Sequence, residues 1–304
     1  MLTDAEVNRF IDMLRYEKRS SLLTCNAYRI VLERTLEVLN REFPELQNWS
    51  DVGLDAMRAL VRDFNFAKAG SKLNRNSVAH SIYSLSSFFR FLVKENVIRD
   101  NPVKLVKVPK VKRHLPKILT LSEIELILKK EPETIYEVRD LTIVELLFSS
   151  GLRVSELTGL KLENYAVSSA EIKVLGKGGK YRIVPVGHEA AIRLAQYLKI
   201  RDQFEPKSDA LFLNKYGEAL TPRGVEQNLD KISQKAGVTT HLNPHKLRHS
   251  FASSLLQGKA DLRSVQEMLG HASLAATQIY THLDFEHLKS VYNSAHPLAK
   301  GHEK

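Results

Sequence analysis

One short segment, residues 101–118, limits how this chain can fold more than any other feature of its sequence. The segment reads NPVKLVKVPKVKRHLPKI, and Pro102, Pro109 and Pro116 prevent a continuous helix from running through it. The chain has 304 residues, which is enough for two domains that each bury a core of their own. We therefore predict an N-terminal domain over residues 1–103, a linker over residues 104–118 and a C-terminal domain over residues 119–304.

The predicted linker is strongly basic, with six Lys or Arg side chains and no acidic residue between them. An extended basic strand of this kind can lie along the phosphates of a nucleic acid, although an ordinary solvated linker has a similar composition. We expect DNA contacts from Lys104, Lys107, Lys110, Lys112 and Arg113.

The whole chain is also basic, with 45 Lys and Arg against 35 Asp and Glu and a formal net charge of +10. Such a surplus favours a polyanionic partner, which is either a nucleic acid or an acidic membrane surface. Cys25 is the single cysteine, so an intramolecular disulfide is excluded and a cytoplasmic setting is expected. The sequence shows no signal peptide and no apolar stretch near the roughly 20 residues of a membrane span, so no membrane partner is expected.

The predicted N-terminal domain consists of helices. Apolar residues recur at helical spacing after the possible caps Thr3 and Asp4, through Tyr16, and again after Thr24. Two further helices are predicted over residues 54–66 and 77–94. Four helices with short connections indicate a small bundle.

The predicted C-terminal domain adds a small amount of β structure. Thr120 and Glu123 form a capping-box pattern, and helices are predicted over residues 121–130 and 139–149. Residues 171–175 and 181–186 flank a GKGGK turn and predict a hairpin. The fold class is therefore mostly α with a small antiparallel β element, in two domains.

Two segments of the C-terminal half place cations where they could meet a phosphate. In SSGLRVSELTGL, residues 149–160, Arg153 and Glu156 are three residues apart and share one face of a helix, as they also would in a plain surface ion pair. In the turn GKGGK, glycines allow a close backbone approach, and either Lys177 or Lys180 can reach DNA unless the turn is only a solvated tip.

Two later segments add histidines and a tyrosine. In NPHKLRHSFA, residues 243–252, His245 and Arg248 lie one turn apart near a predicted helix N-terminus, where anions are favoured. In LGHASLAATQIYTHLD, residues 269–284, Tyr280 follows His271 by nine residues. The chain contains ten tyrosines, so composition alone does not select Tyr280.

Together and in this order, the four segments resemble the tyrosine recombinase (phage integrase) family. The family signature is an Arg, a Lys in a hairpin, a His-x-x-Arg box, a later His or Trp, and a Tyr. By this resemblance Glu156 supports the first arginine, Lys180 contacts DNA, and residues 277–300 are of the Xer type. The resemblance assigns the catalytic roles to Arg153, Lys177, His245, Arg248, His271 and the nucleophile Tyr280.

The resemblance also implies the chemistry. Tyr280 attacks the scissile phosphate, giving a 3′-phosphotyrosine and a free 5′-hydroxyl, with His245 as general base. Lys177 protonates the leaving oxygen, the two arginines bind the nonbridging oxygens, and His271 adds a hydrogen bond. The phosphotyrosine conserves the bond energy, so no cofactor, metal or ATP is expected.

The partners are implied by the same resemblance. They are double-stranded DNA, held in a clamp of the two domains, and a second, XerD-like recombinase in a heterotetramer on two DNA sites. The expected role is to resolve chromosome dimers at a dif-type site, with possible regulation by an FtsK-like translocase. Apolar positions near the C-terminus dock either on a neighbour, as the resemblance favours, or on the same subunit: Leu283, Phe285, Leu288, Val291 and Tyr292.

Four other readings of the sequence compete with this one. A phage or mobile-element integrase of the same family differs only in the C-terminal segment. A type IB topoisomerase shares the chemistry but does not exchange partners, and the two-domain layout argues against it. A metal-dependent nuclease requires clustered carboxylates, which the second half lacks at suitable spacing. A noncatalytic DNA-binding protein explains the charge but not six ordered matches.

Overall fold

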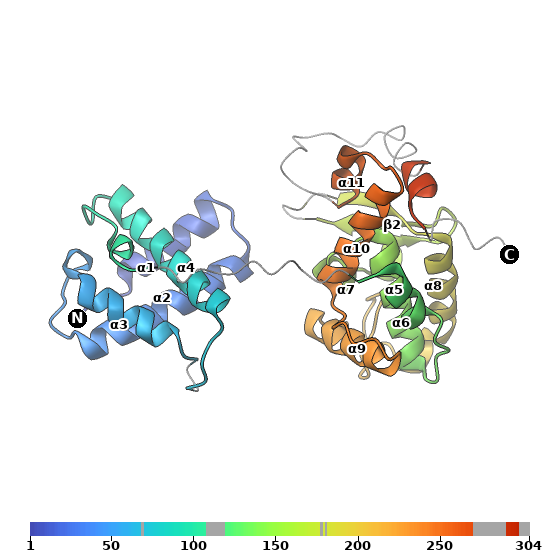
Figure 1. Ribbon diagram of the computed structural model, residues 1–304, viewed down its shortest axis with the longest axis horizontal. Coiled ribbons are helices and arrows are strands. Elements are labelled where there is room, and N and C mark those ends of the chain that lie inside the picture. Colours follow the sequence, from blue (N-terminus) through green and yellow to red (C-terminus); the bar gives the residue numbers. More distant parts are fainter. Residues whose placement is uncertain (68–69, 108–118, 177–178, 180, 270–289, 298–304) are drawn as a thin grey trace. The chain divides into compact units, whose positions relative to one another are not determined.

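The computed structural model divides into two compact units, Met1–Leu115 and Pro116–Lys304, each built around its own hydrophobic core (Figure 1). The structure describes residues 1–67, 70–107, 119–176, 179, 181–269 and 290–297. No helix in these ranges combines the length and the apolar composition that crossing a membrane requires.

The N-terminal unit is a helical bundle, and it confirms the four predicted helices. Its helices are α1 (Ala5–Asp12), α2 (Leu22–Glu42), α3 (Leu54–Phe64) and α4 (Arg75–Lys94), with a short π-helix η1 (Met13–Glu17) and two 3-10 turns, η2 (Trp49–Asp51) and η3 (Pro102–Leu105). Aromatic rings fill the core, where Phe88 meets Phe10 and Trp49 edge to face at centroid distances of 5.6 and 4.9 Å. Such contacts add to the burial of apolar area that stabilises the bundle.

The start of α2 differs from the prediction. The Ser21 side chain accepts a hydrogen bond from the Thr24 backbone N–H, so Ser21 is the N-cap and Thr24 lies inside the first turn. Ser and Thr both favour the N-cap position, so the sequence alone could not decide which of the two residues begins the helix. In the structure their hydroxyl oxygens lie 2.8 Å apart.

The beginning of the basic segment packs on the bundle. Asn101 accepts a hydrogen bond from the Val103 backbone N–H, Pro102 is in the first turn of η3, and Val103 is buried in the core. Lys104 and Lys107 are exposed. Val103, the last residue of the predicted N-terminal domain, is therefore part of the core, and Val106 of the predicted linker packs against it.

The C-terminal unit surrounds one nearly buried helix, α6 (Ile135–Ser150). The unit also contains helices α5 (Leu121–Leu128), α7 (Val154–Thr158), α8 (His188–Ile200), α9 (Pro222–Lys235), α10 (Pro244–Gln257) and α11 (Leu262–Leu269), and turns η4 (Leu162–Asn164) and η5 (Arg201–Phe204). The helices α8, α9 and α10 pack against α6 (Figure 1). Because α6 is covered on several sides, its two ends are fixed within the unit.

A three-stranded antiparallel sheet completes the unit, in the order β1 (Tyr165–Ala166), β2 (Glu171–Leu175), β3 (Tyr181–Pro185). The fold is therefore mostly α with a small antiparallel sheet, as predicted. The capping box of Thr120 and Glu123 is present in full. In contrast, α6 begins four residues before the predicted 139, because the Thr134 side chain accepts the Glu137 backbone N–H and starts the helix there.

The described part of the C-terminal region packs on its own subunit. Residues 290–295 are helical, and Tyr292 and Ala295 form one cluster with Phe251 of α10 and Met268 of α11. Val291 lies against the same cluster. Of the docking positions predicted from the sequence, Val291 and Tyr292 thus contact the same chain, whereas Leu283, Phe285 and Leu288 lie outside the described residues.

A buried histidine follows this cluster. The His296 ring stacks on Tyr292 at a centroid distance of 5.1 Å, and its Nε2 lies 3.3 Å from the Phe148 carbonyl oxygen. Burial lowers the pKa of His296 to about 4, so the ring is neutral at physiological pH. Burial also raises the pKa of the Tyr292 hydroxyl and, for nearby Glu145, raises the carboxyl pKa to about 7.

Candidate active site

The end of α6 determines where the first predicted arginine lies. Gly151 ends the helix in the left-handed conformation, with φ of +60°, which suits a residue without a Cβ atom. Two residues later, Arg153 is the N-cap of α7. Its backbone N–H donates to Glu156 Oε2 at 2.8 Å, and its Nη1 donates to Glu156 Oε1 at 2.9 Å. The predicted pairing of Arg153 with Glu156 is therefore present.

Glu156 is buried and has a second cationic partner, Arg182 of β3. Arg182 donates from Nη1 to Glu156 Oε1 at 2.8 Å and from Nη2 to Oε2 at 2.9 Å, in a bidentate pair. Burial opposes ionisation of Glu156, but the hydrogen bonds and charges of Arg182 and Arg153 outweigh burial and lower its pKa to about 2. Glu156 is therefore an anion throughout the physiological range.

The second predicted arginine comes from α10, whose start agrees with the sequence. The Asn243 side chain accepts the Lys246 backbone N–H, and Pro244 is in the first turn. One turn further, half-buried Arg248 donates from Nη1 to the Gly151 carbonyl oxygen. Burial and the nearby charge of Arg153 lower the pKa of Arg248 to about 10, so it stays protonated at physiological pH.

The two arginines converge on one carbonyl group. The Leu269 oxygen, at the end of α11, accepts Arg248 Nη2 at 2.6 Å and Arg153 Nη1 at 3.4 Å. Segments that are far apart in the sequence thus bring two guanidinium groups together. Two cations held this close, with planar forks, form a place for an anion with several oxygen atoms, such as a phosphate diester.

Of the other four predicted catalytic residues, the structure describes His245. His245 lies in the first turn of α10, one turn before Arg248, and is exposed. The catalytic candidates Lys177, His271 and Tyr280 lie outside the described residues, as do the predicted DNA contacts Lys110, Lys112, Arg113 and Lys180. Among the described residues, the structure therefore brings together Arg153, Glu156 and Arg248.

Sequence reasoning missed Arg182, although a signal for it was present. In β3 the exposed residues Tyr181 and Ile183 alternate with the buried residues Arg182 and Val184. The alternation places an arginine on the inner face of a half-buried strand, where an unpaired charge is costly. A buried carboxylate partner was therefore to be expected, and Glu156 is that partner.

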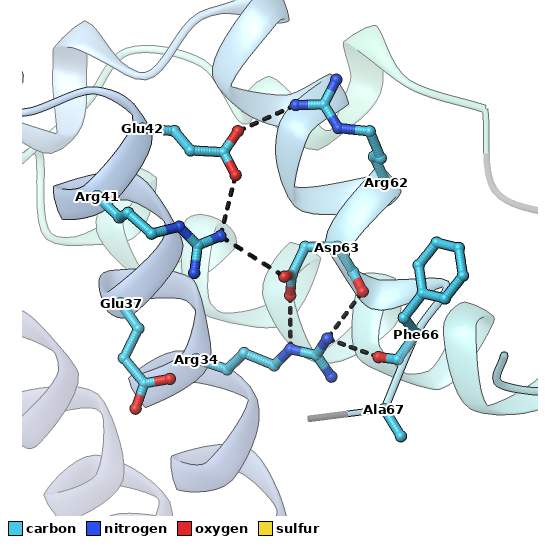
Figure 2. A pocket seen from close by; sticks show the side chains of 8 residues that line it. All are labelled: Arg34, Glu37, Arg41, Glu42, Arg62, Asp63, Phe66 and Ala67. Carbon is cyan, nitrogen blue, oxygen red and sulfur yellow. Dashed lines mark hydrogen bonds and ion pairs between the residues drawn. The ribbon is translucent and has the colours of Figure 1, made fainter. Parts of the chain in front are cut away.

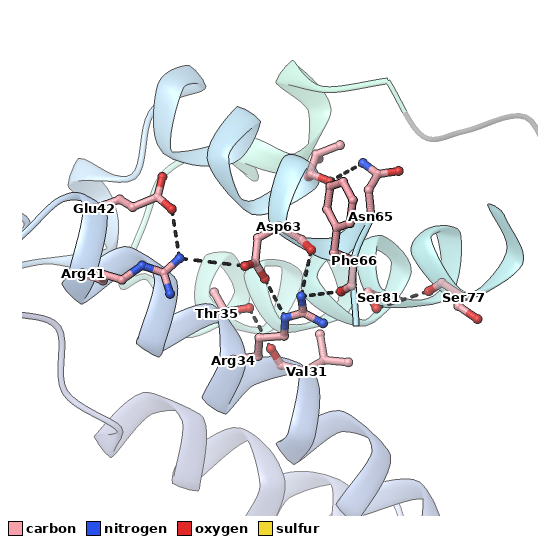
Figure 3. Close-up of polar contacts among 11 residues, drawn as sticks. Val31, Arg34, Thr35, Arg41, Glu42, Asp63, Asn65, Phe66, Ser77 and Ser81 are labelled. Atoms are coloured by element: carbon pink, nitrogen blue, oxygen red, sulfur yellow. Dashed lines mark hydrogen bonds and ion pairs between the residues drawn. The ribbon is translucent and has the colours of Figure 1, made fainter. Parts of the chain in front are cut away.

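A second group of arginines lies in the N-terminal unit, in a hollow of about 430 Å³ beside α2 and α3 (Figure 2). Arg34 donates to the carboxylate of Asp63 and to the carbonyl oxygens of Asp63 and Phe66, and thereby caps the end of α3 (Figure 3). Arg41 and Arg62 both pair with Glu42. Because these cations hold helices together, we assign the hollow a structural role.

Comparison with known proteins establishes the class. The profile of the phage integrase family matches residues 117–287, and that of the phage integrase N-terminal SAM-like domain matches residues 7–96. The chain belongs to the phage integrase family, and it is a site-specific tyrosine recombinase, an enzyme of DNA recombination.

Within this family the chain is similar to XerC proteins. It is 42% identical to the tyrosine recombinase XerC of Actinobacillus succinogenes over 294 residues, covering 97% of this chain and 98% of the relative. It is 41% identical to XerC of Escherichia coli O157:H7 over 295 residues, covering 97% of each. The HLDF run after Tyr280 and the later AHP favour XerC over XerD, and these relatives confirm the XerC likeness.

Solved structures support the same class. The chain is 26% identical to the XerH site-specific recombinase bound to a palindromic difH substrate in a post-cleavage complex. This match has a TM-score of 0.67 and covers 96% of this chain and 85% of the recombinase. The fold described here is thus one that a related recombinase uses on DNA.

Proposed function

We propose that Tyr280 cuts DNA by attacking the scissile phosphate, and that Arg153 and Arg248 bind its nonbridging oxygens. The observation that carries this proposal is the convergence of both guanidinium groups on the Leu269 carbonyl oxygen. A phosphate at that point would replace a neutral acceptor with a charged one, for which two cations have more affinity. Stabilising the charge that develops on a pentacoordinate phosphorus contributes about 3 kcal/mol per well-placed donor.

The other catalytic roles follow from the order of the family signature. His245 assists removal of the tyrosine proton, Lys177 protonates the leaving 5′-oxygen, and His271 donates a hydrogen bond to the same phosphate. Glu156 keeps Arg153 in place. The products of cleavage are a 3′-phosphotyrosine and a 5′-hydroxyl, so the reaction conserves the bond energy for rejoining without an added cofactor.

The biological role that fits the XerC likeness is resolution of chromosome dimers at a dif-type site. In this proposal the two units close around duplex DNA, with the basic linker and Lys180 on the phosphates. A XerD-like recombinase completes a heterotetramer on two DNA sites, and an FtsK-like translocase regulates it in the cytoplasm. The likeness to XerC over 97% of the chain supports this role over that of a mobile-element integrase.

A nicked suicide substrate tests the proposed nucleophile. Radiolabelled duplex with a nick beside the cut site is mixed with wild type and with Tyr280→Phe in the absence of metal, together with a XerD protein. We expect a covalent protein–DNA band on a denaturing gel for wild type and none for Tyr280→Phe. The phenylalanine variant cannot form the phosphodiester to tyrosine, but its DNA affinity is expected to be unchanged.

A band from both proteins would assign the nucleophile to another residue. A wild type that binds the DNA tightly yet forms no band would favour a noncatalytic DNA-binding role.

A further inference from the structure

We propose that Arg182 is a positioning residue for DNA cleavage, which acts through Glu156 on Arg153 without touching DNA. The inference rests on the proposed function, because it requires that Arg153 binds the scissile phosphate. It adds an arginine that the family signature quoted above does not contain.

The first observation is the geometry of the Glu156 carboxylate. Each of its two oxygens accepts one hydrogen bond from Arg182 and one from Arg153. The bidentate fork of Arg182 fixes the plane of the carboxylate, since two parallel bonds remove the rotation that one bond leaves. The orientation of this plane also sets the positions of Glu156 Oε2 and Oε1, which accept from the backbone N–H and the Nη1 of Arg153. Rotation of the carboxylate would therefore move Arg153.

The second observation is burial. The side chains of Arg182 and Glu156 are 7% and 5% exposed, whereas the Arg153 side chain is 36% exposed. Arg182 thus holds the carboxylate from inside the domain, and Arg153 approaches it from the accessible side. Arg153 is thus accessible from the surface of the domain, whereas Arg182 is not.

The third observation is the balance of charge. Arg182 and Glu156 together form a neutral buried pair, so the charge of Glu156 is balanced inside the domain by Arg182. With a neutral residue in place of Arg182, the Glu156 charge would instead be balanced by Arg153. The attraction of the site for a phosphate would decrease accordingly.

A purely structural role would not require an arginine here. The neighbours of Arg182 across and along the sheet include Val174, its partner in β2, and Val184, both of them buried. An apolar residue at this position would continue the core, and replacing a buried ion pair by apolar groups is often neutral or stabilising. The bidentate pair with Glu156, which orients the carboxylate, explains why this position holds an arginine.

The same helix that leads to the site offers a matched control. Arg139 in α6 also pairs with a buried acid, Asp140, at 2.8 Å, with side chains 5% and 12% exposed. Arg139 lies near the start of α6, whereas Arg153 follows its end. Arg139→Met therefore removes a comparable buried ion pair without touching the arginine site.

The test compares Arg182→Met, Arg182→Lys and Arg139→Met with wild type on the nicked substrate, with a XerD protein, under single-turnover conditions and with all DNA bound. We expect Arg182→Met to lower the rate of covalent complex formation about 100-fold, the scale of a misplacement near 1 Å, while all the DNA stays bound. Arg182→Lys keeps the charge but loses the fork, so its loss is smaller. Arg139→Met loses thermal stability and keeps the cleavage rate.

The pH profile separates positioning from general destabilisation. Without Arg182 the pKa of Glu156 rises, because burial then acts against fewer stabilising cations. The ratio of the wild-type rate to the Arg182→Met rate therefore grows as the pH is lowered from 8 to 5.5. The ratio for Arg182→Lys stays constant, because the cation is still present.

The outcomes that contradict the inference differ from those that contradict the proposed function. If the wild-type protein forms no covalent complex with the nicked substrate, the proposed function is overturned, and this inference with it. A cleaving wild type with an equally fast Arg182→Met and the same pH profile would overturn the inference alone, as would equal losses in Arg182→Met and Arg139→Met. If Arg182→Met does not fold, a folded Arg182→Lys with the wild-type rate overturns the inference.

Discussion

Glu156 is an ionised carboxylate inside a protein domain, and two arginines make this possible. Removing its charge would leave Arg182 buried without a counter-charge, which typically costs about 3 kcal/mol or more. We therefore expect Glu156→Gln to lower the free energy of unfolding by roughly this amount at neutral pH, and to abolish most DNA cleavage. Denaturant titration and the nicked substrate measure the two effects.

The same residue predicts how stability depends on pH. The folded-state pKa of Glu156 is about 2 against an ordinary value of 4.5, so its contribution is complete above the ordinary pKa and is lost as the pH falls toward 2. The difference in unfolding free energy between wild type and Glu156→Gln should thus narrow from pH 5 to pH 3. A constant difference over this range would contradict the role assigned to the carboxylate.

At the residue scale the sequence predicted close pairs and missed distant ones. Arg153 and Glu156 are three positions apart, so helix geometry alone brings them together. Arg182 is 26 positions from Glu156, and their contact depends on how the sheet packs against α7. The position of Lys177, His271 and Tyr280 stays a prediction.

At the scale of elements, the way α6 ends at Gly151 affects the position of Arg248 in the site. Gly151 has φ of +60°, and a Cβ atom added there would lie 2.3 Å from a ring carbon of Phe251. Gly151→Ala therefore combines backbone strain with overpacking and should cost about 2 kcal/mol or more. Because the Gly151 carbonyl also accepts Arg248, we expect cleavage to fall as well, as thermal melts and single-turnover assays can measure.

Gly237 provides the control for this substitution. It has φ of +73°, but an added Cβ atom would have no neighbour within 4 Å. Gly237→Ala should therefore show only the backbone cost of about 1 kcal/mol, with normal cleavage. Equal effects of the two substitutions would mean that the contact with Phe251 is unimportant.

Element boundaries were predictable where a cap had one candidate. Thr120 with Glu123, and Asn243 before Pro244, were placed correctly. Near Ser21 several hydroxyl residues compete, and the choice depends on packing of the helix against the bundle. The packing of residues 290–295 on their own subunit likewise depends on tertiary contacts, such as those of Tyr292 with Phe251 and Met268.

At the scale of the whole molecule, the proline-containing segment predicts two units, and the chain divides into Met1–Leu115 and Pro116–Lys304. The net charge of +10 predicts that DNA binding weakens steeply with salt. Lys104 and Lys107 are exposed at the start of the basic segment. If both contact phosphates, the double substitution Lys104→Ala/Lys107→Ala should reduce the slope of log K against log salt by about 2.

The control for the salt experiment is Lys129→Ala. Lys129 is exposed but pairs with Glu125 in α5, so its removal should leave the slope nearly unchanged. Binding isotherms between about 50 and about 300 mM salt give both slopes. A double variant with the wild-type slope would place the basic segment away from the DNA.

The convergence of Arg153 and Arg248 on the Leu269 carbonyl has a consequence for evolution as well as for chemistry. Two like charges held together repel each other, and the charge of Arg153 adds to the effect of burial in lowering the pKa of Arg248. The domain is therefore less stable at this point than a neutral version would be, and selection for stability alone would remove one of the cations. We therefore interpret the pair as a trade-off, in which the unbound protein tolerates a repulsion that a bound phosphate would relieve.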